Sequence, residues 1–117
     1  MRSGIVHEVA RLVEFFVRRI TVEGSSMVPA FVPGECLTAV RRWRHVRAGD
    51  VVVLRDPRNG ERWLLKRCVG RVGALLDLRG DNADASTDSR EFGLVREGSV
   101  TWIVLSKRLK EGRVAPR

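Results

Sequence analysis

The first twenty residues place polar and apolar side chains with the period of an α-helix. At about 100° per residue, the polar positions fall on one face and the apolar positions on the opposite face. The pattern therefore predicts an amphipathic helix over residues 1–20. The polar face carries His7, Arg11, Glu14 and Arg18, and the apolar face carries Ile5, Val9, Leu12, Val13, Phe16 and Ile20.

Two interpretations of this helix remain open. Its apolar face can pack on its own domain or on a second copy of the chain, as the face of a surface helix usually does. Alternatively, it lies in a membrane interface, which Phe15, Phe16 and the flanking arginines favour. Charged residues interrupt the apolar stretch, so no clear transmembrane anchor is expected in this segment.

After Glu23 the pattern changes to that of short strands. Runs of β-branched and apolar residues, bounded by Gly, Pro, Asn or Asp, predict a small, mainly β, antiparallel domain over residues 21–106. A hairpin turn is expected at residues 57–60 (PRNG), because Asn and Gly tolerate positive φ. Residues 107–117 are expected to form a basic C-terminal tail. The expected strands are 20–23, 36–40, 50–55, 62–69, 74–79 and 100–106.

Charge and composition narrow the choice of partners and cofactors. The chain of 117 residues carries 22 Lys and Arg against 14 Asp and Glu, a net charge of +8, which suggests an anionic partner. No nucleic-acid-binding motif accompanies this charge, so no nucleic acid is expected. Cys36 and Cys68 are expected in the core, and His7 and His45 at the surface. Neither a metal nor a cofactor is therefore expected.

Three polar clusters call for a chemical explanation. The first is GSSMVP at residues 24–29, the second is Lys66 within an apolar strand, and the third is GDNADASTDSREFG at residues 80–93. On a strand, Leu64, Lys66 and Cys68 share one face, so either Lys66 or Arg67 turns inward. Burial lowers the pKa of a lysine and makes its neutral amine a general base. The alternative is an exposed lysine on a half-buried hairpin.

The two serines of the first cluster are both eligible nucleophiles. A serine hydroxyl needs an adjacent base, and a neutral lysine can act where histidine is absent. Gly24 permits close approach of the backbone, and the turn can aim amides at one point. The alternative is an ordinary polar turn with Met27 packed on the core.

Together and in this order, the three clusters resemble those of the type I signal peptidase family of Ser/Lys-dyad peptidases. The resemblance covers residues 20–106 and implies the small antiparallel β domain that this family shares with the SOS repressors. It implies that Ser26 is the nucleophile and Lys66 the general base, with Ser26 Oγ within about 3 Å of Lys66 Nζ. In the third cluster it implies a lysine-orienting hydroxyl at Ser86 and an ion pair between Asp88 and Arg90. Asp81 and Asn82 match the family's turn.

The resemblance also implies where a substrate peptide would lie. The family's oxyanion donor corresponds to the Ser26 amide, but Gly24 stands where some members carry a second, hydroxyl donor. Ser25 or another backbone amide is left as the candidate for that role. Substrate recognition resembles strand addition in a groove that accepts small side chains, which Met27, Phe31 and Leu64 could line if they are not core residues.

Only 13 residues separate Lys66 from Gly80, too few for the extra β domain of larger members. The chain is therefore similar to small maturation peptidases such as those of nickel superoxide dismutases, and is expected to remove a leader from a protein partner. Its expected location is the cytoplasm or the membrane periphery, with peripheral membrane contact through the N-terminal helix. The alternatives are a self-cleaving SOS-repressor-like domain and a non-catalytic membrane-surface or peptide-binding module.

Overall fold

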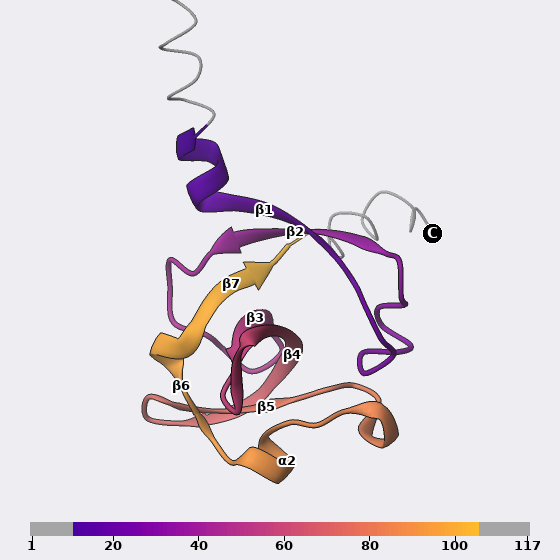
Figure 1. Cartoon of the computed structure of the whole chain (residues 1–117). Helices are drawn as coiled ribbons and strands as arrows, with labels where there is room; N and C mark the ends of the chain where they lie inside the picture. The colour runs from indigo at the N-terminus through magenta and orange to yellow at the C-terminus, as the bar shows by residue number, and fades with distance from the viewer. Residues whose placement is uncertain (1–10, 106–117) are drawn as a thin grey trace, which may run out of the picture.

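The computed structural model describes residues 11–105 and confirms a mainly β, antiparallel architecture (Figure 1). Within that range, seven strands form one sheet in the order β1-β2-β7-β3-β4-β5-β6. The strands are β1 (Val17–Thr21), β2 (Cys36–Arg41), β3 (Val51–Asp56), β4 (Asn59–Val72), β5 (Leu75–Arg79), β6 (Val95–Arg96) and β7 (Val100–Val104). Short helical segments η1 (Ala83–Ala85), α2 (Ser89–Phe92) and η2 (Glu97–Ser99) lie between β5 and β7.

Strand β4 organises the sheet because it is long enough to pair with two neighbours. Its first part pairs with β3, from Trp63 opposite Arg55 to Arg67 opposite Val51, as the sequence predicted. From Arg67 onward it also pairs with β5. The register shifts between Cys68 and Gly70, and such irregularities bend and twist a sheet. The bend lets the sheet wrap around its own core.

The core consists of clusters built from alternate strand positions. The largest joins the inward faces of β3, β4, β5 and β7, and a second packs the loop after β1 against β2 and β3. The alternation on β4 confirms the predicted face, since Leu64 and Cys68 are buried while Val69 is 48% exposed. The two clusters contain Val46, Val52, Leu54, Leu64, Cys68, Leu76, Leu78, Val95, Val100 and Ile103, and Val22, Met27, Phe31, Leu37 and Val51.

The predicted N-terminal helix is too long at its C-terminal end. Residues 11–16 are helical, but residues 17–21 form β1, which pairs with β2 from Val17 opposite Val40 to Thr21 opposite Cys36. Pairing with β2 outweighs the helical periodicity, because β-branched residues suit a strand once a partner is available. The part of the prediction before residue 11 lies outside the described residues.

The apolar side chains of residues 11–16 are not covered by the described domain. Leu12, Val13, Phe15 and Phe16 are 60%, 54%, 50% and 49% exposed. One tether is present, because Arg41 donates a 2.8 Å hydrogen bond to the Phe15 carbonyl and stacks 4.0 Å from its ring. Figure 1 shows this segment standing clear of β5 and α2. In the part of the chain that the structure describes, we find no helix able to cross a bilayer.

The hairpin between β3 and β4 forms where predicted, but by a different turn. Asp56 pairs with Asn59, so Pro57 and Arg58 are the turn residues. Neither Asn59 nor Gly60 has a positive φ, so the reason given for this turn was wrong. Instead, the Asp56 carboxylate accepts a 2.8 Å hydrogen bond from the Arg58 amide, which closes the turn locally.

Two further expectations concern single residues. Cys68 is buried as expected, whereas Cys36 is exposed at the start of β2. Cys36 is the first residue of β2, and its side chain points away from the core because Leu37 and Ala39, on the other face of the strand, are buried. The His45 side chain is 85% exposed, as expected of a surface histidine. His7 lies outside the described residues.

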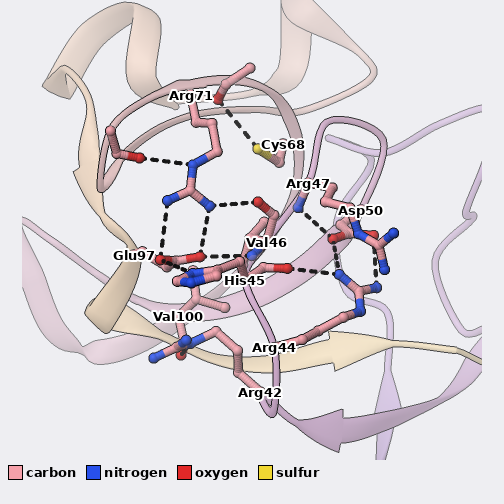
Figure 2. Close-up of polar contacts among 12 residues, drawn as sticks. Arg42, Arg44, His45, Val46, Arg47, Asp50, Cys68, Arg71, Glu97 and Val100 are labelled. Atoms are coloured by element: carbon pink, nitrogen blue, oxygen red, sulfur yellow. Dashed lines mark hydrogen bonds and ion pairs between the residues drawn. The ribbon is translucent and has the colours of Figure 1, made fainter.

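A polar network holds the loop before β3 against the end of the sheet (Figure 2). The Glu97 carboxylate accepts a 2.7 Å hydrogen bond from the Val46 amide and bonds of 2.8 and 3.2 Å from Arg71. Arg71 also donates to the Val46 carbonyl at 2.7 Å. Glu97 is 7% exposed, and these donors lower its pKa from 4.5 to about 2, the Arg71 hydrogen bond contributing most.

We expect Glu97→Ala to lower the free energy of unfolding by about 2 kcal/mol at neutral pH, because it leaves the buried Val46 amide without an acceptor. Since folding depresses the carboxyl pKa, the carboxylate stabilises the fold fully above pH 4.5, and this contribution is lost as the pH falls toward about 2. Urea unfolding across that range measures both effects. His45→Ala serves as the control, because it removes a contact of 3.0 Å to the same carboxylate from a side chain that is 85% exposed, and it should change stability little. Equal stability of Glu97→Ala and the native protein would contradict the assignment.

Candidate active site

The first cluster forms a turn directly after β1. Gly24 adopts a φ of 76°, which favours glycine, and the next residues run into a loop whose Met27 is 1% exposed. The Phe31 amide donates to the Met27 carbonyl at 2.9 Å, so the loop folds back on its buried methionine. Ser25 is exposed and Ser26 is half-buried. Burial of Met27 thus holds in place the backbone next to Ser26.

Asn82 fastens this turn from the third cluster. Its backbone amide donates to the Ser26 carbonyl at 2.8 Å, and its side-chain amide donates to the Ser25 carbonyl at 3.0 Å. Sequence reasoning assigned Asn82 only to a turn and missed this contact. The signal that could have found it is an amide side chain, able to donate twice, in the loop that the resemblance places near the nucleophile.

Lys66 turns inward and is 3% exposed, which resolves the choice between Lys66 and Arg67. Arg67 lies on the other face of β4 and forms an ion pair with Asp81 at 2.9 Å. The Lys66 amine donates a 2.7 Å hydrogen bond to Ser86 Oγ, and the Ser86 hydroxyl donates to Asp88 Oδ2 at 2.8 Å. The amine, a hydroxyl and a carboxylate therefore form one chain of hydrogen bonds.

The end of that chain is a completely buried carboxylate. Asp88 is 0% exposed and accepts hydrogen bonds from the Gly80 amide at 2.9 Å and from Arg90 Nε at 2.9 Å. Burial alone would raise the pKa of Asp88, but the hydrogen bonds from Arg90, Gly80 and Ser86 outweigh it and lower the pKa far below 3.8. Asp88 is therefore a permanent anion at neutral pH.

Burial also sets the protonation of the lysine. Removal of the Lys66 amine from water lowers its pKa from 10.5, and the positive charges of Arg62 and Arg90 lower it further, against the attraction of Asp88. A lowered pKa increases the fraction of neutral amine at physiological pH. Neutral amine is the form that can accept a proton.

Lys66 and Ser26 line the same cavity, of about 190 Å³. Its walls also include Gly24, Ser25, Met27, Leu64 and Thr87, and Arg58 and Arg62 from the β3–β4 hairpin. Within residues 11–105, no hydrogen bond joins Ser26 to Lys66, whose amine is directed to Ser86 instead. Phe31 is 2% exposed in the core and is not a wall of this cavity.

A larger groove of about 560 Å³ adjoins this cavity. Val22, Glu23, Arg62, Leu64 and Leu65 line both, so the groove continues the cavity between β1 and β4. Over residues 11–105, no group of three or more His, Cys, Asp or Glu side chains is arranged to hold a metal ion. The donors present suit proton transfer and the binding of an extended peptide.

Gly80 is the position where the segments of the site come closest. A Cβ atom there would lie 2.6 Å from Ser86 Cβ and 2.7 Å from the Ser26 carbonyl oxygen. Real Cβ atoms do not approach other atoms so closely, so only glycine leaves room for both neighbours. Absence of a side chain at residue 80 is thus a condition for the observed geometry.

We therefore expect Gly80→Ala to lower the free energy of unfolding by about 1–3 kcal/mol and to displace Ser86 or the Ser26 carbonyl. Chemical denaturation measures the loss. Gly60→Ala is the matched control, because a Cβ at residue 60 meets nothing within 4 Å and φ is not positive there. Equal effects of the two substitutions would show that the close approach at Gly80 has no energetic weight.

Comparison with known proteins identifies the family. A family model described as signal peptidase, peptidase S26, matches residues 4–79. The chain is 32% identical to mitochondrial inner membrane protease subunit 2 of Schizosaccharomyces pombe, over 74% of this chain and 61% of that protein. It is 31% identical to mitochondrial ATP-independent inner membrane protease subunit 1a of Arabidopsis thaliana, over 69% and 64%. It thus spans about three-fifths of the length of these relatives. With more than half of its residues matched, the chain belongs to the signal peptidase family, peptidase S26.

Proposed function

We propose that this chain is a serine endopeptidase that removes a leader segment from a protein partner, with Ser26 as nucleophile and Lys66 as general base. The observation that supports this most directly is a buried lysine amine and a serine hydroxyl lining one cavity. The names of its relatives, which are mitochondrial inner membrane proteases, agree with peptide-bond cleavage.

The chemistry follows from the protonation of the two groups. The neutral Lys66 amine takes the proton of the Ser26 hydroxyl as its oxygen attacks the peptide carbonyl. The resulting ammonium returns that proton to the departing amine, and the peptide bond breaks. Water then attacks the acyl-serine, again with Lys66 as base, and releases the second product. Ser86 keeps the amine oriented between these steps, because it accepts one of its hydrogens at 2.7 Å.

The backbone of the turn supplies the oxyanion donor in this proposal. In the described range, the Ser26 amide donates to no other backbone carbonyl, while the carbonyls on either side are held by Asn82. Fixing those carbonyls fixes the planes of the adjoining peptides and hence the direction of the amide. Gly24 offers no hydroxyl, and Ser25 in the cavity wall is the candidate for a second donor.

The substrate is an extended peptide in the groove between β1 and β4. β1 lies at one edge of the sheet, and β4 pairs with β5 only from Arg67 onward, so both strands present backbone groups toward the groove. A peptide there gains main-chain hydrogen bonds, and its side chains enter the cavity beside Met27 and Leu64. The small volume of the cavity, about 190 Å³, favours a small residue before the scissile bond.

We expect Ser26→Ala and Lys66→Met each to reduce cleavage of a leader-bearing peptide by about 10⁴-fold or more, because each removes one partner of the proton transfer. The native enzyme should gain activity with rising pH and reach its plateau below pH 10.5, since burial lowers the Lys66 pKa. Rates measured by mass spectrometry across pH test both points. Circular dichroism is the control for folding, and full activity of either variant would refute the dyad.

We further propose that residues 11–16 hold the enzyme at a membrane surface. Four apolar side chains of this segment are each about half exposed: Leu12, Val13, Phe15 and Phe16. Their exposure to water is energetically unfavourable, whereas a lipid interface would accommodate them. Arg41, stacked on Phe15, and Arg18, hydrogen-bonded to the Glu14 carbonyl, place positive charge beside these apolar groups. This combination matches an anionic bilayer.

Replacing Phe15 and Phe16 together by Ser should weaken binding to vesicles containing anionic lipid by about tenfold, because two apolar side chains no longer enter the interface. Sedimentation with vesicles measures this binding. Val72→Ser is the control, since Val72 is an apolar residue that is 70% exposed at the C-terminal end of β4, outside residues 11–16. If both proteins bind as the native chain does, residues 11–16 are not the membrane contact.

A further inference from the structure

Arg62 occupies a distinctive position in the site. It lies on β4 four residues before Lys66, so the two side chains project from the same face of the strand. It lines both the catalytic cavity and the adjoining groove, together with Glu23, Leu64 and Leu65. Arg62 therefore borders the path from the groove to Ser26.

Three of the other arginines near the site are already engaged, and Arg19 lines only the groove and not the catalytic cavity. Arg58 pairs with Asp56 at 3.1 Å, Arg90 pairs with Asp88, and Arg18 lies 5.1 Å from the Trp102 ring. For Arg62, by contrast, the structure of residues 11–105 contains no hydrogen bond or ion pair, and its side chain is exposed. A guanidinium has five N–H donors arranged to bind a carboxylate with two hydrogen bonds.

The surrounding charges favour an anion at this point. The cavity and the groove are lined by four arginines, Arg18, Arg19, Arg58 and Arg62, in addition to Lys66. Only two carboxylates, Glu23 and Glu61, face them within the described residues. A substrate carboxylate would therefore find a net positive lining, whereas a substrate ammonium would be repelled.

We propose that Arg62 determines specificity by binding the carboxylate of an Asp or Glu close to the scissile bond of the substrate. The inference rests on the proposed function and deepens it, because it names the chemistry of the segment that the enzyme cleaves. A charge-assisted, bidentate contact of this kind at a partly exposed position corresponds to a preference of about tenfold.

The test uses short synthetic peptides with alanine before the scissile bond and Asp, Asn or Lys placed in turn at each neighbouring position. For the native enzyme, kcat/KM should be about tenfold higher with Asp than with Asn at one of these positions, and lowest with Lys. Arg62→Gln should abolish the preference, Arg62→Glu should reverse it in favour of Lys, and Arg62→Lys should retain part of it. The preference should fall at high salt, because exposed charges are screened.

The ratio of rates, rather than the rate itself, is the informative quantity. Burial is the main cause that lowers the pKa of Lys66, and Arg62 lowers it further, so the effect of Arg62→Gln through Lys66 slows the cleavage of every peptide at neutral pH by the same factor. A change in the ratio of the rates therefore reports the contact between Arg62 and the substrate. Arg55→Gln is the matched control, because Arg55 lies 4.2 Å from the Trp63 ring and donates to the Gly60 carbonyl, outside both cavities. It should leave the preference intact.

Binding to the Ser26→Ala protein separates this inference from the proposed function. Calorimetry should show tighter binding of the Asp peptide than of the Asn peptide, and loss of that difference when Arg62→Gln is added. A binding preference without any cleavage by the native enzyme would refute the peptidase and leave the Arg62 site standing. Cleavage or binding that does not discriminate Asp from Asn, or that discriminates equally after Arg62→Gln, would overturn the role of Arg62.

Discussion

Burial of the Lys66 amine is the constraint around which the site is built. A lysine that is 3% exposed must be hydrogen-bonded, and Ser86 meets that need at 2.7 Å. The Ser86 hydroxyl is itself fixed by Asp88, which Arg90 and the Gly80 amide keep ionised in a dry position. The hydrogen bonds that the Lys66 amine needs are therefore supplied by the loop after β5, and they hold that loop against β4. Burial of that amine costs stability and lowers its pKa.

The fold assembles this arrangement from segments that lie far apart in the sequence. β4 and β5 are neighbours in the sheet, so the loop after β5 starts beside Lys66, whereas β1 lies at the far edge. Curvature of the sheet brings the turn after β1 to the same cavity, and Asn82 links the two regions through the Ser25 and Ser26 carbonyls. Away from the site, the hydrogen bonds of Glu97 likewise link distant segments, since they connect the loop before β3 to β4 (Figure 2).

Strand alternation made much of this predictable. The alternation of β2, β3, β4 and β5 was visible in the sequence, and it limited the inward-facing cation to Lys66 or Arg67. The structure, with Lys66 3% exposed, decided between the two. Two features were missed because they depend on tertiary contacts: β1 replaced a predicted helical turn once β2 was available, and the bonds of Asn82 link residues up to 57 positions apart. Local sequence carries neither of these partners. The turn after β3 was assigned to the wrong local cause, because the Asp56 side chain closes it without positive φ.

The choice of arginine for nearly every positive charge is consistent with the proposed chemistry. Lys66 is the only lysine in the first 106 residues, although the chain carries 22 basic side chains in total. A second lysine in the cavity wall could lose its proton in the same environment and compete as a base. Arginine stays protonated there, so Arg58, Arg62 and Arg90 can surround the site as fixed charges. Burial is the main cause of the lowered Lys66 pKa, and the fixed charges of Arg62 and Arg90 lower it further. In the proposed mechanism, anion binding and base catalysis are therefore compatible within one cavity.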